Sequence, residues 1–184
     1  MSEDVRTTTR PELLDDGIDD HRFRALIYDI LAFSNRLEEV RNGLGALMGL
    51  TGPQYSALIA IRMLRDNDRI GISDIANYLH VSGAFITSEV NKLIKLGLVS
   101  KVPDEQDRRR VTVSITPEGE ERLAKLSVHQ RPVNDTLFAN VTREEFQMLS
   151  ALLPRLIRQG DEAELYVDYL LKKNSPKLAE SEAS

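Results

Sequence analysis

Apolar residues recur every three or four positions over most of the chain, which predicts a mainly helical protein. The first such pattern covers residues 19–50 and is longer than an ordinary helix. Its apolar positions are Phe23, Leu26, Ile30, Phe33, Leu37, Leu44 and Leu47. Pro53 is well placed as the first residue of a second helix, which we expect to end at residues 66–68. Ile70 and Ile72 then predict a short strand.

Two short helical patterns follow between Ile72 and Gly97. Ser73 and Ser82 stand where helix N-caps belong, and Gly97 stands where a glycine ends a helix. In the second pattern one stripe is apolar, formed by Ile86, Val90 and Leu93. The remaining surface of this pattern carries Ala84, Thr87, Ser88 and Asn91. The segment therefore predicts a helix, a tight turn and a second helix.

The segment after Gly97 predicts a β-hairpin, because apolar residues alternate with Ser and Thr as in a half-buried strand. The apolar positions are Val99 and Val102 before the turn, and Val111, Val113 and Ile115 after it. Pro103 and an acidic run mark the reversal, and the tip carries Arg108, Arg109 and Arg110. Taken alone, this tip is equally well interpreted as a solvated loop whose arginines balance its acidic residues.

Two further helices are predicted after the hairpin. Thr116 caps a helix over residues 117–137, which we expect Pro132 to kink. Thr142 and Glu145 have the spacing of a capping box, which opens the last helix. Its apolar 3,4 seam consists of Phe146, Leu149, Leu153, Leu156, Gly160, Ala163, Val167 and Leu170, with Pro154 and Gly160 as expected sites of bending.

The apolar seams of the first and last long helices are too extensive to be buried against a small winged-helix body. Two arrangements stay open: packing within one chain as a helical bundle, or a two-fold dimer that joins both ends of each chain. The candidate interface residues are Phe23, Leu26, Phe146, Leu149, Leu153, Leu156, Val167 and Leu170.

These patterns predict a mainly α fold with a small β-wing. Residues 51–116 are expected to form a helix-turn-helix unit with a β-wing, and residues 19–50 and 117–173 to form the long helices that serve as dimerisation helices in the two-fold arrangement. The polar segment 1–18 is expected to be a mobile arm, and the polar segment 174–184 a disordered tail.

The net charge of −5 argues against a nucleic-acid partner, but the charge is unevenly distributed. Between Thr51 and Pro117 nine basic residues face seven acidic ones, so this part carries +2 and the remainder −7. Attraction to phosphates depends on the local potential, because salt screens charges beyond about 8 to 10 Å. The composition therefore predicts modest non-specific affinity for DNA and does not exclude binding.

Other kinds of chemistry have little support in the sequence. The chain contains no Cys, which excludes disulfides, thiolate metal sites and cysteine nucleophiles. His21, His80 and His129 are scattered, so we predict no metal site. There is no nucleophile elbow and no Gly-rich phosphate loop, and we predict neither an enzyme nor a cofactor. No long apolar run or leader is present, so the expected location is the cytoplasm.

The hairpin resembles the wing of the MarR family of winged-helix transcriptional regulators. The family pattern is Asp, any residue, Arg, five residues, an aliphatic residue and Thr. Asp107, Arg109, Ile115 and Thr116 match it, and Gly119 follows. The pattern that the family shows at the C-terminal end of its recognition helix is also present here, as Leu93, Gly97, Leu98 and Val99. The helical order of the family can be laid over roughly residues 20 to 172.

The resemblance implies a homodimer that binds double-stranded DNA at a pseudo-palindromic operator. It implies that Arg109 enters the minor groove with Asp107 orienting it, while Lys92 lies near phosphates and the helix N-terminus at Ser82 holds a phosphate. The implied DNA-contacting residues are Ser82, Ala84, Phe85, Thr87, Ser88, Asn91, Lys92, Asp107, Arg108, Arg109 and Arg110.

Two residues depart from the common family pattern. Ser88 stands where many members carry Arg, and Glu89 replaces an aliphatic residue, so this helix lacks the side chain best suited to guanine. Two roles stay open for Phe85: contact with thymine methyl groups, or packing in the core of the motif.

MarR-like regulators also commonly bind small aromatic or phenolic acids, or thioesters of such acids. The resemblance therefore implies an effector site between the dimer helices and the winged helix. Candidate lining residues are Tyr28, Arg36, Tyr55 and Arg62, each of which is also explained as core or solvated surface. The predicted function is a dimeric DNA-binding regulator, expected to be a repressor released by such a ligand. The alternative is a winged-helix module that binds protein and not DNA. The main support for this alternative is the negative net charge of the whole chain.

Overall fold

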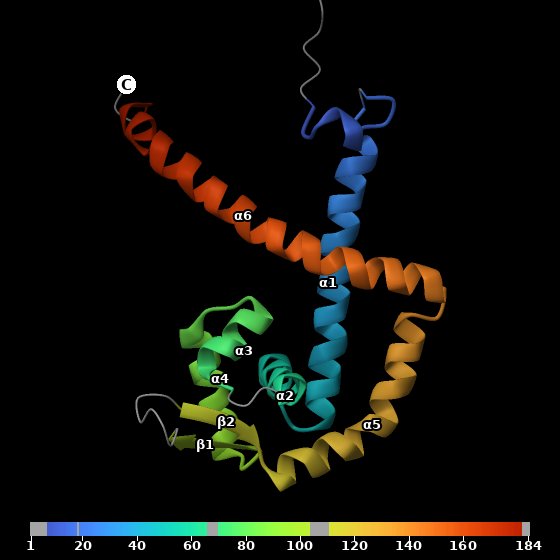
Figure 1. Cartoon of the computed structure of the whole chain (residues 1–184), viewed down its shortest axis with the longest axis vertical. Coiled ribbons are helices and arrows are strands. Elements are labelled where there is room, and N and C mark those ends of the chain that lie inside the picture. Colours follow the sequence, from blue (N-terminus) through green and yellow to red (C-terminus); the bar gives the residue numbers. More distant parts are fainter. Residues whose placement is uncertain (1–6, 18, 66–69, 104–110, 182–184) are drawn as a thin grey trace, which may run out of the picture. The chain divides into compact units, whose positions relative to one another are not determined.

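The computed structural model describes residues 7–17, 19–65, 70–103 and 111–181 (Figure 1). Its elements are η1 (Pro11–Leu13), α1 (His21–Leu47), α2 (Gly52–Leu64), α3 (Ile72–Leu79), α4 (Gly83–Lys95), β1 (Val99–Pro103), β2 (Val111–Ile115), α5 (Pro117–Leu137) and α6 (Arg143–Ser181). The predicted mainly helical fold with a small antiparallel sheet is confirmed. The chain divides into two compact units, Met1–Asn134 and Asp135–Ser184, and each unit is described separately below.

Helix α2 lies at the centre of the first unit, where it contacts α1, α3, α4 and β2. Figure 1 views α2 end-on, with α1 on one side of it and α3 and α4 on the other. The largest fully buried side chains are Tyr55, Leu58, Ile61, Ile75, Ile86, Val90, Leu93, Leu98, Val113 and Leu123. Burying an aliphatic side chain of this size contributes about 1.5 to 3 kcal/mol relative to leaving it exposed. Three of these residues come from α4, so the core fixes which face of that helix remains outside.

Side-chain hydrogen bonds cap the N-termini of α2, α3 and α4. The Thr51 hydroxyl accepts from the Gln54 backbone N–H and the Gln54 side chain accepts from the Thr51 N–H, which forms a capping box at the start of α2. The Ser82 hydroxyl caps α4, as predicted, by accepting from the Phe85 N–H at 3.2 Å. The predicted cap at Ser73 is wrong: the N-cap of α3 is Gly71, two residues earlier, and the Asp74 carboxylate accepts from the Gly71 N–H at 2.8 Å.

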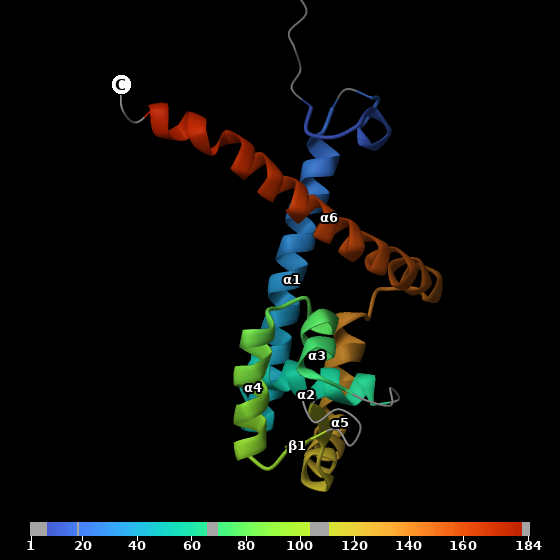
Figure 2. The same cartoon turned by 60° about the vertical axis from the view of Figure 1, so that its left-hand side comes forward.

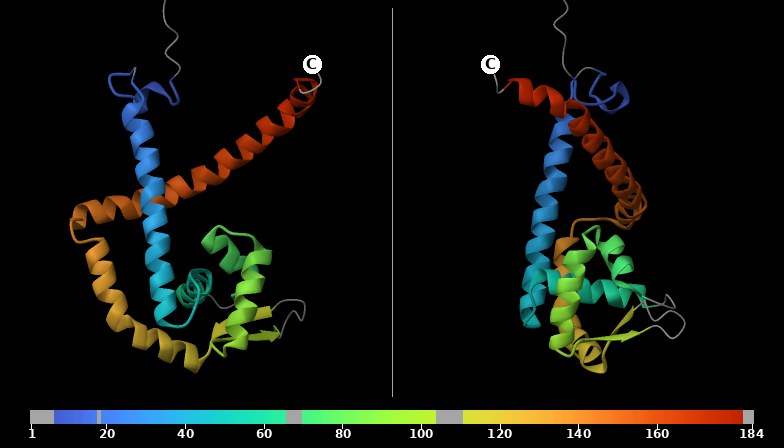
Figure 3. Two further views of the ribbon diagram at one scale, coloured as in Figure 1. Left: turned by 180° about the vertical axis from the view of Figure 1, so that it is seen from behind. Right: turned by 90° about the vertical axis from the view of Figure 1, so that its left-hand side faces the viewer.

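The sheet consists of two antiparallel strands, in which Val99 pairs with Ile115 and Lys101 pairs with Val113. Figure 3 shows both strands beside one end of α4. The strand predicted at Ile70 and Ile72 is wrong, because Ile72 is the first residue of α3. The Ile70 carbonyl nevertheless accepts from the Val113 N–H at 2.8 Å, so the segment before α3 adds one backbone bond to the edge of β2.

The end of α4 and the start of α5 are joined by short polar contacts. Gly97 has a φ of +72°, which glycine adopts without strain, and it ends α4 as predicted. Thr116 donates its hydroxyl to the Gly97 carbonyl at 2.6 Å and its N–H to the Leu98 carbonyl at 3.0 Å. The same hydroxyl accepts from the Gly119 N–H at 3.1 Å. A Cβ added at Gly119 would overlap the Leu98 carbonyl oxygen, so this junction requires glycine.

Residues 7–17 contact the start of α1, and the mobility predicted for residues 1–18 stays a prediction. Both the backbone N–H and the hydroxyl of Thr8 donate to the Asp20 carboxylate, at 3.1 and 2.6 Å. Arg24 also donates to this carboxylate, at 2.9 Å. The Thr8 hydroxyl and Arg24 hold the pKa of Asp20 below its usual value. The contacts are therefore present while Asp20 is ionised and weaken as the pH falls through that lowered pKa.

The second unit consists of the end of α5 and the long helix α6. The predicted capping box opens α6: Thr142 donates its N–H to the Glu145 carboxylate at 2.8 Å and caps the Glu145 N–H at 3.2 Å. Phe138 and Phe146 meet edge to face, with ring centroids 6.0 Å apart. Helix α6 continues through Pro154 and Gly160 to Ser181. The disorder predicted for residues 174–184 stays a prediction.

Candidate nucleic-acid interface

Figure 2 shows helix α4 at the outer edge of the first unit. The side of α4 opposite its buried residues is exposed and mostly polar. Ala84, Ser88, Asn91 and Lys95 are exposed at spacings of four, three and four residues, which places them on one line along the helix. Lys95 was not among the predicted contacts. The signal was available in the sequence, because Lys95 continues the spacing of the other three residues.

The two other predicted polar residues of α4 have partners within the helix. The Thr87 hydroxyl donates to the Gly83 carbonyl at 2.8 Å, which turns it back toward its own backbone. The Lys92 ammonium donates to the Glu89 carboxylate at 2.6 Å, and Glu89 is only 5% exposed. A buried carboxylate is stable only when it is paired. The Lys92 ammonium therefore stabilises the buried Glu89 carboxylate, and the carboxylate in turn neutralises the charge of Lys92. Neither Thr87 nor Lys92 therefore faces outward as freely as Ser88 and Asn91.

Phe85 is 41% exposed, so it does not belong to the buried core of the motif. It lies in the first turn of α4, next to the exposed N-terminus at Ser82, Gly83 and Ala84. The proposed contact with thymine remains a prediction. The predicted wing residues Asp107, Arg108, Arg109 and Arg110 lie outside the described residues, although β1 and β2 lead into and out of that segment.

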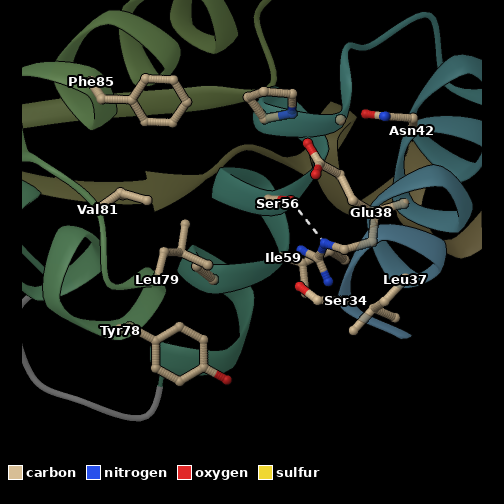
Figure 4. Close-up of a pocket in the computed structure, with 14 residues that line it drawn as sticks. Ser34, Leu37, Glu38, Asn42, Ser56, Ile59, Tyr78, Leu79, Val81 and Phe85 are labelled. Carbon is tan, nitrogen blue, oxygen red and sulfur yellow. Dashed lines mark hydrogen bonds between the residues drawn. The ribbon is translucent and has the colours of Figure 1, made fainter. Parts of the chain in front are cut away.

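A groove of about 570 Å³ opens between α1, α2 and the α3–α4 turn (Figure 4). Its walls are largely apolar and include Leu37, Ile59, Tyr78 and Phe85. The guanidinium of Arg41 also lines the groove. It donates to the Ser56 hydroxyl at 2.9 Å and lies over the Tyr55 ring, 5.5 Å from the ring centroid. Glu38 lines the same groove. The groove thus combines apolar walls with one guanidinium and one carboxylate.

The four predicted effector residues are not brought together at this groove. Tyr28 is 71% exposed, and Arg36 is also exposed. Tyr55 is buried beneath Arg41, and this burial raises the pKa of its hydroxyl despite the opposing effect of the guanidinium. Arg62 lies 3.8 Å from the Glu120 carboxylate. The sequence pointed to residues of α1 and α2, two of the helices that line the groove, but not to Arg41, because the wall of the groove depends on how those helices pack. The effector site itself stays a prediction.

The predicted dimerisation residues retain much of their apolar surface in the single chain. Phe23 and Leu170 are partly buried and the other six are exposed. On α6, Phe146, Leu149, Leu153 and Leu156 share one face by their helical spacing, and Leu153 and Leu156 are 47% and 46% exposed. Exposed apolar stripes of this length are typical of interaction surfaces.

Other kinds of site have less support. Within the described ranges no three His, Cys, Asp or Glu side chains are grouped closely enough to hold a metal ion, and the absence of a metal site stays a prediction. In the same ranges no single helix combines the length and apolarity needed to cross a membrane. The pair α1 and α2 meets that test only together, across a bend of 87°.

The sequence profile of the MarR family matches residues 48–110, which run from the end of α1 through the two short helices to the wing. The chain belongs to the MarR family. Its membership in this family of transcriptional regulators confirms the prediction that it is not an enzyme. The residues matched include the whole of α4, the predicted recognition helix of the MarR-family motif.

Individual MarR-family and related proteins agree with this assignment. The HTH-type transcriptional regulator YdgJ of Bacillus subtilis is 28% identical over 106 residues, which are 58% of this chain and 65% of YdgJ, slightly under two thirds of its length. The transcriptional regulator BldR of Sulfolobus solfataricus has a similar structure, with a TM-score of 0.61 and 29% identity over 76% of this chain and 96% of BldR. A mutant of MarR from E. coli, solved with operator DNA, has a TM-score of 0.62 and 22% identity over 74% of this chain and 96% of its own, and shows the same fold.

Proposed function

We propose that this MarR-family regulator is a homodimer that binds a pseudo-palindromic operator and represses transcription until a small aromatic acid or its thioester releases it. The observation that carries the proposal is the exposed polar stripe of α4, Ala84, Ser88, Asn91 and Lys95, on a helix whose other face is fixed in the core. Such a helix can enter the major groove without unfolding. Because its target is chromosomal DNA, the proposed location is the cytoplasm.

The dimer is supported by the exposed apolar seams of α1 and α6, which a second copy of the chain can cover. A two-fold dimer reads a two-fold sequence, and it places two recognition helices about one DNA turn apart. The E. coli MarR mutant solved with operator DNA has the same fold, which supports the same mode of binding here. In this proposal Arg109 of the wing enters the minor groove, Asp107 orients it, and Arg108 and Arg110 lie near phosphates.

We expect selection from random DNA duplexes by the full-length protein to enrich an inverted repeat whose half-site centres are about 10 bp apart. Binding to this repeat should weaken steeply with salt, because each phosphate neutralised releases condensed cations. The measurement is sequencing of the bound pool, followed by titration of the enriched duplex at several salt concentrations. A pool without enrichment, together with salt-independent binding to protein partners, would instead support the winged-helix module that binds protein.

The groove between α1 and α2 supports the proposed ligand class. Its volume lies within the range of about 300 to 1,000 Å³ that is typical of sites for small ligands. The guanidinium of Arg41 has further N–H donors for a carboxylate, while the walls accept an aromatic ring. Glu38 disfavours a second negative charge on the ligand. Phe85 belongs both to the groove and to α4, so a ligand there contacts the recognition helix directly.

We expect an aromatic monocarboxylate that binds this groove to raise the thermal midpoint and to lower operator affinity about 5- to 150-fold, the usual range of coupling between two sites. Arg41→Met should abolish both effects of the ligand, because it removes the charge and keeps a long apolar side chain. The measurement is a screen of benzoate- and cinnamate-type acids and their thioesters by thermal shift and operator release. Arg36→Met is the matched control on the same helix, since Arg36 does not line the groove, and equal loss in both variants would contradict this site.

A further inference from the structure

The groups that α4 offers to base edges are few, and the structure reduces them further. The helix, Gly83–Lys95, contains no arginine, which is the side chain that most often reads guanine. Glu89 is buried and held by Lys92, so no carboxylate of α4 is free to accept from cytosine. The Thr87 hydroxyl is committed to the Gly83 carbonyl. The polar groups left on the exposed stripe are the Ser88 hydroxyl, the Asn91 carboxamide and the Lys95 ammonium.

Asn91 lies between the two other polar residues that remain on the exposed stripe of α4. It is exposed, with Ser88 three residues before it and Lys95 four residues after it on the same line. In the described part of the chain no hydrogen bond or ion pair holds its carboxamide. A carboxamide carries an acceptor oxygen beside a donor NH₂, and adenine presents a donor N6 beside an acceptor N7 in the major groove. This pair forms two bonds at once, whereas Ser88 can form a bond with any base and therefore discriminates little.

The rest of the stripe suits the same base pairs. Ala84 lies seven residues before Asn91 on the same face, and the half-exposed ring of Phe85 lies beside it. Small apolar groups in the major groove contact the 5-methyl group of thymine, the partner of adenine. Lys95 is a long, flexible cation at the C-terminal end of α4, a position better suited to a phosphate than to a fixed base edge.

We propose that Asn91 is the base-specifying residue of the recognition helix and that it selects adenine at one position of each half-site. This inference rests on the proposed function, because it requires that α4 enters the major groove. It extends that function by naming the residue that reads sequence and the base pair that it reads. The remaining stripe residues contribute thymine-methyl and phosphate contacts around that pair.

The test uses the full-length protein and the enriched duplex from the selection described above. We expect replacement of one A·T pair by G·C in both half-sites to weaken wild-type binding about 5- to 150-fold per pair, the range for a bidentate contact. We expect 7-deazaadenine at the same position, which lacks the N7 acceptor, to weaken binding as well. Asn91→Ala should bind the original and altered duplexes with affinities within about twofold of each other.

Lys95→Ala is the matched control on the same stripe, and it should weaken binding to all these duplexes equally, because a phosphate contact carries no sequence information. Asn91 is exposed, so its replacement leaves the core intact. The inference is overturned if Asn91→Ala keeps the wild-type preference for adenine, or if Lys95→Ala removes a guanine preference instead. If no duplex is enriched by wild-type protein, the proposed function fails and this inference fails with it. If duplexes are enriched without a preferred adenine, only the inference fails.

Discussion

Leu153→Asp combined with Leu156→Asp is expected to give a monomer that binds the operator at least about 100-fold more weakly than the wild-type protein. Both side chains lie on the exposed apolar face of α6, which the proposed dimer buries. Each aspartate would place an unpaired carboxylate in that interface, and such burial is strongly unfavourable. A monomer binds one half-site only. It therefore loses the roughly 10²- to 10⁴-fold gain in affinity that two linked binding sites provide. Light scattering and operator titration measure the two effects.

The matched control adds two carboxylates to the opposite face of the same helix. Gln147 and Ala151 are exposed, and their helical positions lie on the side away from the seam. The double variant Gln147→Asp and Ala151→Asp should remain a dimer with nearly wild-type affinity. A seam variant that stays dimeric and binds normally would show that this face of α6 packs within its own chain.

Gly119→Ala is expected to lower the free energy of unfolding by about 1 to 3 kcal/mol, the usual cost of adding a methyl group where there is no room. The new Cβ would overlap the Leu98 carbonyl oxygen and lie 2.6 Å from a methyl carbon of Ile115. The carbonyl cannot rotate away, because it accepts the Thr116 N–H in the junction between α4 and α5. Urea unfolding at a fixed protein concentration measures the loss as a lower midpoint.

Gly43→Ala is the control for the intrinsic preference of alanine in helices. Gly43 lies inside α1, and an added Cβ there meets no atom within 4 Å. This variant should be more stable than wild type by about 0.5 to 1 kcal/mol, because alanine loses less backbone freedom on folding than glycine. Equal shifts of the same sign in both variants would contradict the steric role of Gly119.

Local chemistry made several features of the fold predictable from the sequence. Caps at Ser82, Thr116 and Thr142 depend on residues within three positions, so their spacing alone is informative. The helix end at Gly97 and the two strands of alternating apolar and polar residues were predictable for the same reason, because their sequence signals are also local. The error at Ser73 has the same origin, because Gly71 and Asp74 form an equally local cap that begins α3 earlier. Two candidate caps in one short segment cannot be ranked without the packing of Ile72.

Features that depend on contacts distant in sequence were not predictable. The groove around Arg41 requires α1 and α2 to pack, and the bonds from Thr8 to Asp20 join residues 12 positions apart. Burial of Glu89 was also hidden, since a charged residue in a helical pattern is normally assigned to the solvent side. The predicted contacts on α4 otherwise follow from helical spacing, because its apolar stripe defines its exposed side; their role in DNA binding stays a prediction.

The Thr116 junction also determines how movement can reach the DNA-facing surface. Two hydrogen bonds, of 2.6 and 3.0 Å, and the close approach at Gly119 fasten the end of α4 to the first turn of α5. In mechanical terms the first turns of α5 act as a lever clamped to the recognition helix. We expect a rotation applied to this part of α5 to carry the stripe from Ala84 to Lys95 with it, without any bending or unwinding of the recognition helix.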